Sequence, residues 1–278
     1  MINYQISSHY SSFATVRFDT KEPEDIQFGT VVSINGSIHA NLPDPSLGFS
    51  NYTTGSDVYN VIENLLSYSN ICGSRMVILV KRYPNRQDIS GIVNKLRYHH
   101  ALVTFIVSNS PSGGDTVSRD LYDIASKTNG FCAFNDDFYF HITITNVPGL
   151  AHPYQTYSVN VKVSGVGTRS LPIQRAPDAA YYYHYMTIQE QRPHNSFQNI
   201  TLQWANLDDP TDFQYVSVDE PYIYYHFKNG NFFDWFYEYS KGNYTMNLKF
   251  NYTDTDVHTL QIRTFRQEPV DFWIPYQD

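Results

Sequence analysis

Three short apolar runs in the first half of the chain are separated by segments with helical periodicity. The runs are Arg75–Val80, Ala101–Ser108 and Phe131–Phe134. Between them, Asp88 and Asp115 each precede apolar residues that recur three or four positions apart. The order strand–helix–strand–helix–strand predicts a parallel sheet covered by helices, which places ligand sites at the carboxyl ends of the strands.

The residues before these runs have a weaker pattern. Ser11–Phe18 is β-prone and predicts a strand, and Val31–Ile34 predicts a further short extended piece. Asn41–Gly55 is rich in Pro, Gly, Ser and Asn, which predicts a loop. Ser56 then caps a predicted helix with an apolar stripe, so helices and strands are expected to alternate up to about residue 147.

Beyond a Pro- and Gly-containing linker at residues 148–153, the period changes from helical to alternating. Apolar and polar residues alternate along Tyr157–Val163, Ile200–Trp204 and Tyr244–Tyr252. Such alternation without helical stripes is typical of half-buried antiparallel strands. We therefore expect two domains, an α/β domain over residues 1–147 and a β-sandwich over residues 154–278.

Composition narrows the classes of partner. The formal net charge is −8, divided evenly between the two halves with no basic stripe, which argues against nucleic acid. The longest clean apolar run, Met76–Val80, is far shorter than the ~18 residues of a membrane span. Met1–Tyr10 lacks the pattern of a signal peptide, and taken literally this indicates the cytoplasm.

Five Asn-x-Ser/Thr sequences point the other way, toward a secreted glycoprotein. Their acceptors are Asn35, Asn51, Asn199, Asn243 and Asn251. The last three fall on the polar side of predicted strands, where a glycan would be accessible. Asn and Thr also belong on a solvated strand face without any glycan, and both interpretations stay open.

The two cysteines, Cys72 and Cys132, are too few for a disulfide framework. Cys72 precedes the first of the predicted parallel strands, and Cys132 lies within the third. With the second strand between them, they are separated by about 9–10 Å, beyond the ~7 Å reach of a disulfide. We expect them not to be bonded.

Motifs that carry catalysis are missing from the sequence. It contains no Gly-x-Ser-x-Gly, no Gly-x-x-x-x-Gly-Lys and no His-Glu-x-x-His. Asp44–Ser50 and Thr253–Asp256 hold oxygen donors, but they are better interpreted as a Pro-rich loop and a hairpin turn. We therefore predict no enzyme activity, no cofactor and no metal.

Aromatic residues provide the one candidate surface. They cluster in two segments of the second half, and the predicted binding residues are Tyr181, Tyr183, Tyr185, Phe233, Trp235 and Tyr237. Tyr and Trp give large contact areas at low entropic cost. Because both faces of these strands are aromatic, the alternative is that one face is core and the other is covered by the first domain.

The order of elements resembles a von Willebrand factor A-like domain with a Rossmann-like sheet. In this comparison Ser11–Phe18 corresponds to its second strand, Thr53-Thr54-Gly55-Ser56 to its threonine loop, and the three apolar runs to strands four to six. More closely, the chain resembles an uncharacterised nematode family that joins a degenerate A-like domain to a C-terminal β domain. Gly73–Pro84, Asp88–Ser110 and Asn146–Pro153 carry that resemblance.

The resemblance implies an extracellular protein whose A-like domain lacks its first strand, as in an N-terminally truncated chain. It also implies a lost metal site, because Lys81 and Arg82 stand where the fold has a ligand carboxylate and only Thr53 or Thr54 could match the rest of the site. The expected function is non-catalytic recognition of an extracellular protein or glycan. The alternatives are a non-functional or intracellular fragment of a longer secreted protein, and a hydrolase that lacks an evident nucleophile and base.

Overall fold

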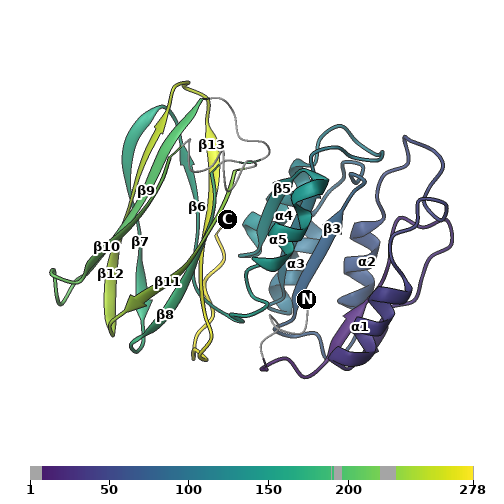
Figure 1. The fold of residues 1–278 in the computed structure, drawn as a ribbon, viewed down its shortest axis with the longest axis horizontal. Coiled ribbons are helices and arrows are strands. Elements are labelled where there is room, and N and C mark those ends of the chain that lie inside the picture. The colour runs from purple at the N-terminus through teal and green to yellow at the C-terminus, as the bar shows by residue number, and fades with distance from the viewer. Residues whose placement is uncertain (1–7, 189, 191–195, 220–229, 278) are drawn as a thin grey trace.

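The computed structural model describes residues 8–188, 190, 196–219 and 230–277. Figure 1 shows a mixed region of helices and short strands beside a pair of sheets with long strands. We call residues 8–147 the mixed region and residues 154–266 the sandwich. The element types change between the helix that ends at Thr145 and the strand that begins at Tyr154.

The centre of the mixed region is a three-stranded parallel sheet. Its strands are β3 (Arg75–Val80), β4 (Leu102–Ser108) and β5 (Phe131–Asn135), in the order β3-β4-β5. Helices α2 (Val58–Leu65), α3 (Ser90–Tyr98) and α4 (Arg119–Lys127) pack on one face through a shared hydrophobic core. A short 3-10 turn (Asp137–Tyr139) and α5 (Phe140–Thr145) follow β5.

The first forty residues differ from the sequence prediction. The strand expected over Ser11–Phe18 shrinks to β1 (Phe13–Thr15), which pairs with β2 (Gln27–Gly29) in a separate antiparallel sheet and does not join β3. The extended piece expected at Val31–Ile34 is wrong, because α1 (Val31–Ala40) begins there. Thr30 caps this helix by accepting a hydrogen bond from the Ser33 N–H, and Ile34 is its buried residue.

The sandwich is built from two four-stranded antiparallel sheets. One has the order β10-β9-β12-β7 and the other β11-β8-β13-β6. The strands are β6 (Tyr154–Val163), β7 (Val166–Ala176), β8 (Ala180–Thr187), β9 (Phe197–Asn206), β10 (Phe213–Asp219), β11 (Asn231–Tyr239), β12 (Gly242–Tyr252) and β13 (His258–Arg266).

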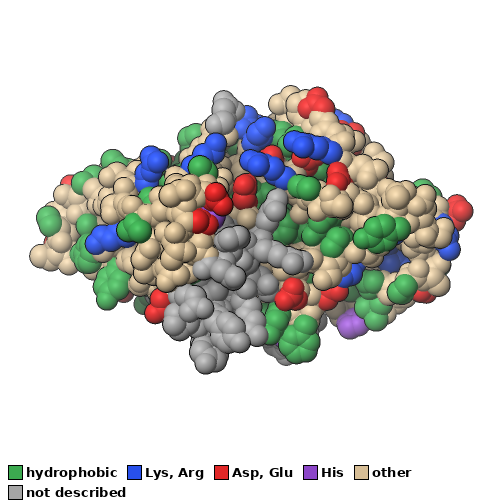
Figure 2. Space-filling model, turned by 90° about the horizontal axis from the view of Figure 1, so that it is seen from above, with side chains coloured by type: hydrophobic (Ala, Val, Ile, Leu, Met, Phe, Trp, Pro, Cys, Tyr) green, Lys and Arg blue, Asp and Glu red, His purple; other side chains and the backbone are tan. Residues whose placement is uncertain are grey.

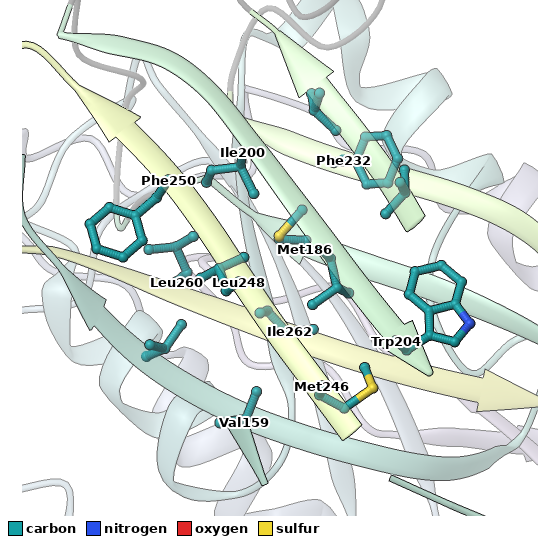
Figure 3. Close-up of a cluster of buried hydrophobic side chains, with 14 of the residues drawn as sticks. Val159, Met186, Ile200, Trp204, Phe232, Met246, Leu248, Phe250, Leu260 and Ile262 are labelled. Carbon is teal, nitrogen blue, oxygen red and sulfur yellow. The ribbon is translucent and has the colours of Figure 1, made fainter. Parts of the chain in front are cut away.

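Alternate residues of these strands form the largest core of the molecule. Figure 3 shows Val159, Met186, Leu248 and Ile262 pointing into the space between the two sheets. Trp204 is also fully buried there and stacks on the ring of His184, with centroids 4.7 Å apart. Burial lowers the pKa of His184 to about 3, so its imidazole is neutral in this aromatic environment.

The predicted fold class, an α/β von Willebrand factor A-like domain followed by a β-sandwich, is wrong. Strands make up 40% of the chain and helices 18%, and the described residues form four sheets and five α-helices in a β-rich fold. The parallel sheet has only three described strands, and the segment expected as another strand of it pairs elsewhere. Strand–helix alternation over a short stretch therefore did not extend to a Rossmann-like domain.

Side chains of the sandwich cover the edge of β5. Arg263 Nε donates to the Gly130 carbonyl at 2.7 Å, and Gln261 Oε1 accepts from the Cys132 N–H at 2.9 Å. Asn231 Nδ2 donates to the Phe134 carbonyl at 2.9 Å. Two outward carbonyls and one outward N–H at this edge are thus paired with side chains of another sheet.

Cys72 and Cys132 are both free thiols, the first exposed and the second buried. The strand order β3-β4-β5 puts β4 between them, as predicted. Burial raises the pKa of the Cys132 thiol well above its usual value, which keeps this thiol protonated and unreactive.

Candidate binding cleft

A large cleft lies in the mixed region between β3 and the elements that precede it. Its volume is about 2170 Å³, and its walls come from β1, α1, α2 and β3. Apolar side chains dominate the lining, among them Ile38 of α1, Leu65 of α2 and Leu79 of β3. Small-molecule pockets measure roughly 300–1,000 Å³. This cleft is therefore larger than one small ligand requires.

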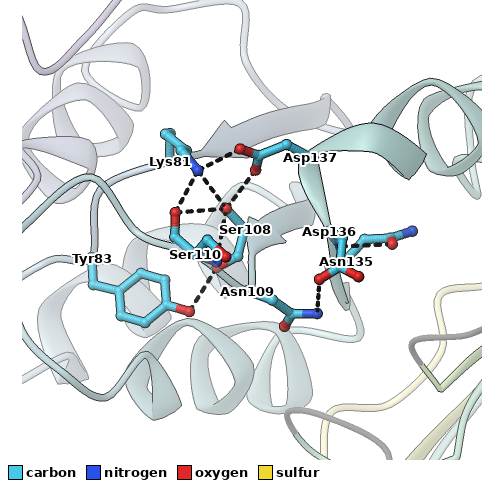
Figure 4. A network of polar contacts seen from close by, with 8 residues as sticks. All are labelled: Lys81, Tyr83, Ser108, Asn109, Ser110, Asn135, Asp136 and Asp137. Carbon is cyan, nitrogen blue, oxygen red and sulfur yellow. Dashed lines mark hydrogen bonds and ion pairs between the residues drawn. The ribbon is translucent and has the colours of Figure 1, made fainter.

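A polar cluster lies at the carboxyl ends of the parallel strands, and two of its residues, Lys81 and Asp137, line the cleft. Lys81 follows β3, Ser108 ends β4, and Asp137 follows β5, so the topology brings the three together (Figure 4). Lys81 Nζ lies 3.0 Å from Ser108 Oγ and 2.5 Å from Asp137 Oδ2, and Ser108 Oγ donates to Asp137 Oδ1 at 2.6 Å. The sequence identified Lys81, but not the carboxylate that it meets.

The burial of Ser108 in this cluster does not suit nucleophilic catalysis. Desolvation acts to raise the pKa of Asp137, but hydrogen bonds from Lys81 and Ser108 outweigh it and lower that pKa. Asp137 is therefore a carboxylate, and it accepts a hydrogen bond from Lys81 Nζ. A serine nucleophile needs both a base to take its proton and contact with its substrate. Ser108 hydrogen-bonds to an ionised carboxylate, but it is fully buried, so a substrate would not reach its Oγ.

Arg82, the second cation expected to oppose a metal, has a structural role. It is buried and donates to the carbonyls of Asn51, Thr54 and Phe49 at 3.1, 2.7 and 3.1 Å. The threonine loop is thus tied to a cation, and the Thr53 hydroxyl donates to Asn51 Oδ1 at 2.9 Å. Within residues 8–188, 190, 196–219 and 230–277, no group of three or more His, Cys, Asp and Glu side chains could hold a metal ion.

Asp19, which lines the cleft, forms a pair with Asp57 that the sequence did not indicate. The Asp57 N–H donates to Asp19 Oδ1 at 2.9 Å, and the Asp19 N–H donates to Asp57 Oδ1 at 2.7 Å. Burial raises the pKa of Asp19 to about 7, and the nearby Asp57 acts in the same direction against a hydrogen bond from Ser56. Asp19 is therefore half protonated near neutral pH.

The predicted aromatic surface does not form one patch. Tyr185 and Phe233 are buried against Phe131 of β5, with ring centroids 6.4 and 6.2 Å from it, so they are not available to a separate partner. The alternative from the sequence, that the first half of the chain covers one face of these strands, accounts for the burial of Tyr185 and Phe233.

The other four aromatic residues are dispersed. Tyr183 stacks on His152, and burial lowers the pKa of that histidine to about 4. Tyr237 packs edge-on against Trp204, beneath the sheet, and Tyr181 is 45% exposed. The side chain of Trp235 lies outside the described residues.

The five candidate glycan acceptors lie in different environments. Asn51 and Asn243 are exposed, in a loop and at the start of β12. Asn35 lies on α1 and is half-buried. Asn199 of β9 and Asn251 of β12 are half-buried and sit directly opposite each other in the strand register.

The surface carries charges of both signs. On the face seen from above, Lys and Arg side chains lie among Asp and Glu (Figure 2). No described helix is both long and apolar enough to cross a membrane.

Comparison with known proteins identifies one segment. Residues 159–267 match a family described as Domain of unknown function (DUF7154). The match begins within β6 and ends just past β13, so it corresponds to the sandwich and leaves out the cleft. No curated protein matches the chain.

Proposed function

We propose that this protein is a non-catalytic binding protein that receives an extracellular protein ligand in the cleft beside β3. The observation that supports this most is the cleft itself, about 2170 Å³ with a mainly apolar lining. An apolar groove of this size fits a protein segment better than a glycan, whose hydroxyl groups need polar partners.

The polar cluster at the end of the cleft supports binding over hydrolysis. The Ser108 hydroxyl donates a hydrogen bond to the Asp137 carboxylate, and its oxygen accepts from Lys81 and from the Ser110 N–H at 3.1 Å. With every hydrogen-bonding position taken and no exposed surface, Ser108 serves to hold three strand ends together. The five glycan acceptors support an extracellular location within the same proposal.

The proposal is tested by selecting ligands from a displayed peptide library and a glycan array, then measuring binding in solution. Leu79→Arg would place a charged side chain in the cleft at a residue that is 41% exposed. Ile173→Arg is the matched control on β7, where Ile173 is 58% exposed and is not one of the residues that line the cleft.

We expect Leu79→Arg to abolish binding of the selected ligands and Ile173→Arg to leave their affinity unchanged. The proposal is wrong if neither library gives a ligand, or if the selected ligands bind the Leu79→Arg variant as well as the unchanged protein.

A further inference from the structure

The two edges of the parallel sheet differ in whether their outward backbone groups have hydrogen-bond partners. At the β5 edge, the Gly130 and Phe134 carbonyls and the Cys132 N–H have side-chain partners from the sandwich. In a parallel ladder, alternate residues turn both backbone groups to the same neighbour. Gly130, Cys132 and Phe134 are the residues of this segment that face away from β4, so each of them has one outward backbone group paired with a side chain of the sandwich.

The same rule identifies the open groups of β3. The Ser74 carbonyl accepts from the Leu102 N–H at 2.9 Å, so Ser74, Met76, Ile78 and Val80 turn toward β4. Arg75, Val77 and Leu79 must then turn their N–H and C=O groups to the other side. In the described part of the chain, no hydrogen bond reaches the backbone groups of these three residues.

This open edge lies along the cleft. Every residue from Ser74 to Leu79 lines it, and the facing walls are β1, α1 and α2. Exposed edges are usually protected by charged residues, prolines or bulges. Arg75 is charged, but its guanidinium donates to the Pro153 carbonyl. Met76–Val80 has no charged residue, proline or bulge, and Val77 and Leu79 keep part of their side chains exposed.

We propose that the open edge of β3 is an acceptor for one extended peptide segment, which adds to the sheet as a fourth strand inside the cleft. This inference rests on the proposed binding function and specifies its ligand. Backbone groups of Arg75, Val77 and Leu79 supply affinity, and the apolar walls select a segment with alternating apolar side chains. The walls also restrict the edge to a single strand, because a second sheet could not approach β3 past β1 and α2.

The occupant is a peptide because the edge presents backbone donors and acceptors at the spacing of another strand. Three outward-facing residues present donors and acceptors in alternation, about 6.6 Å apart from one residue to the next on the same edge. An extended backbone repeats its own donors and acceptors at this interval, whereas a lipid chain or a sugar does not.

The probe is a synthetic peptide of three Val-Thr repeats flanked by two lysines at each end, which keep it from pairing with itself. Its binding to the full chain is measured by fluorescence anisotropy. The decisive comparison is a second peptide in which both the valines and the threonines are N-methylated, which removes the donors on both edges of the peptide without removing apolar surface. We expect the N-methylated peptide to bind at least about tenfold more weakly.

Two measurements on the protein complete the test. Amide hydrogen exchange should slow at Val77 and Leu79 on adding the unmodified peptide, while Met76 and Ile78, already bonded to β4, should change little. Leu79→Pro removes an outward N–H and should weaken binding, whereas Leu79→Ala keeps that N–H and serves as its control.

The outcomes separate the two proposals. If the unmodified peptide does not bind, or if both peptides bind equally with no slowing at Val77 and Leu79, strand addition is wrong. The binding function survives that result if ligands selected from the libraries remain sensitive to Leu79→Arg. If those ligands are not sensitive to Leu79→Arg, the proposed binding function is wrong together with strand addition.

Discussion

The side chain of Gln261 on β13 pairs with the backbone of Cys132 on β5, through a hydrogen bond of 2.9 Å from the Cys132 N–H to Gln261 Oε1. Gln261 is fully buried, and its Nε2 also donates to Ser126 Oγ at 2.9 Å. One side chain of the sandwich thus makes hydrogen bonds both to the outward edge of β5 and to a serine of helix α4 in the mixed region.

Replacing Gln261 with Leu should destabilise the protein by about 1–3 kcal/mol, because the buried Cys132 N–H loses its acceptor while the volume of the side chain stays similar. Urea unfolding followed by circular dichroism measures this. Gln203→Leu is the matched control, since Gln203 lies on the outer face of β9, and it should change stability by less than about 0.5 kcal/mol. Equal effects of the two substitutions would contradict the interpretation.

Asp19 should make stability depend on pH. Its pKa in the folded protein is about 7, above the unfolded value of 3.8, so the folded state holds a proton that the unfolded state has lost. The contribution is therefore most favourable below pH 4, and stability declines as the pH rises toward 7. The slope approaches about 1.4 kcal/mol per pH unit for one proton.

Asp19→Asn tests this pH dependence, because Asn keeps the oxygen that accepts from the Asp57 N–H and cannot titrate. Urea unfolding between pH 4.5 and 7.5 should show a flatter profile for the variant than for the unchanged protein. Parallel profiles would show that Asp19 titrates at its ordinary pKa.

Burial should decide which member of the polar cluster matters for stability. Lys81 and Asp137 side chains are 46% and 53% exposed, so Lys81→Met should change stability by only about 0–1 kcal/mol. Ser108 is fully buried, and Ser108→Ala should destabilise by about 1–3 kcal/mol because the Ser110 N–H loses a partner. Thermal unfolding of the two variants gives the order directly, and a larger loss for Lys81→Met would refute it.

Glycan occupancy should follow the strand register. Asn199 and Asn251 are direct cross-strand neighbours, which puts their Cβ atoms about 4.5–5.5 Å apart, too close for two glycans. In chains secreted by eukaryotic cells, glycopeptide mass spectrometry should find Asn51 and Asn243 occupied, and never both Asn199 and Asn251 on one molecule. Asn251→Gln should raise occupancy at Asn199. Molecules with both sites occupied would disprove the prediction.

Local periodicity predicted the elements of the chain better than their assembly. The alternation at Tyr157–Val163 and Tyr244–Tyr252 identified strands that are present, with the apolar residues buried. It failed at Val31–Ile34, where a cap from Thr30 and the spacing of Ile34 and Ile38 favour a helix over the β-branched composition.

The candidate site was predictable only in part, because its contacts join distant segments. Lys81 was recognised as a charge at a strand end, but its partner Asp137 comes 56 residues later. The open edge of β3 depends on which segments pair with it, and the pairing of β1 with β2 is not encoded in any local pattern. Nor could the aromatic strands indicate which face meets the sandwich core and which meets β5.

The closure of the β5 edge by Gln261 and Arg263 also affects how the chain emerges from the ribosome. Cys132 and its acceptor are 129 residues apart, so at a typical synthesis rate the strand waits on the order of 10 s for its partner. During that interval both edges of the nascent three-stranded sheet are uncovered. The β5 edge therefore lacks these hydrogen bonds until β13 is made, and chaperone binding to the incomplete chain should concentrate in this interval.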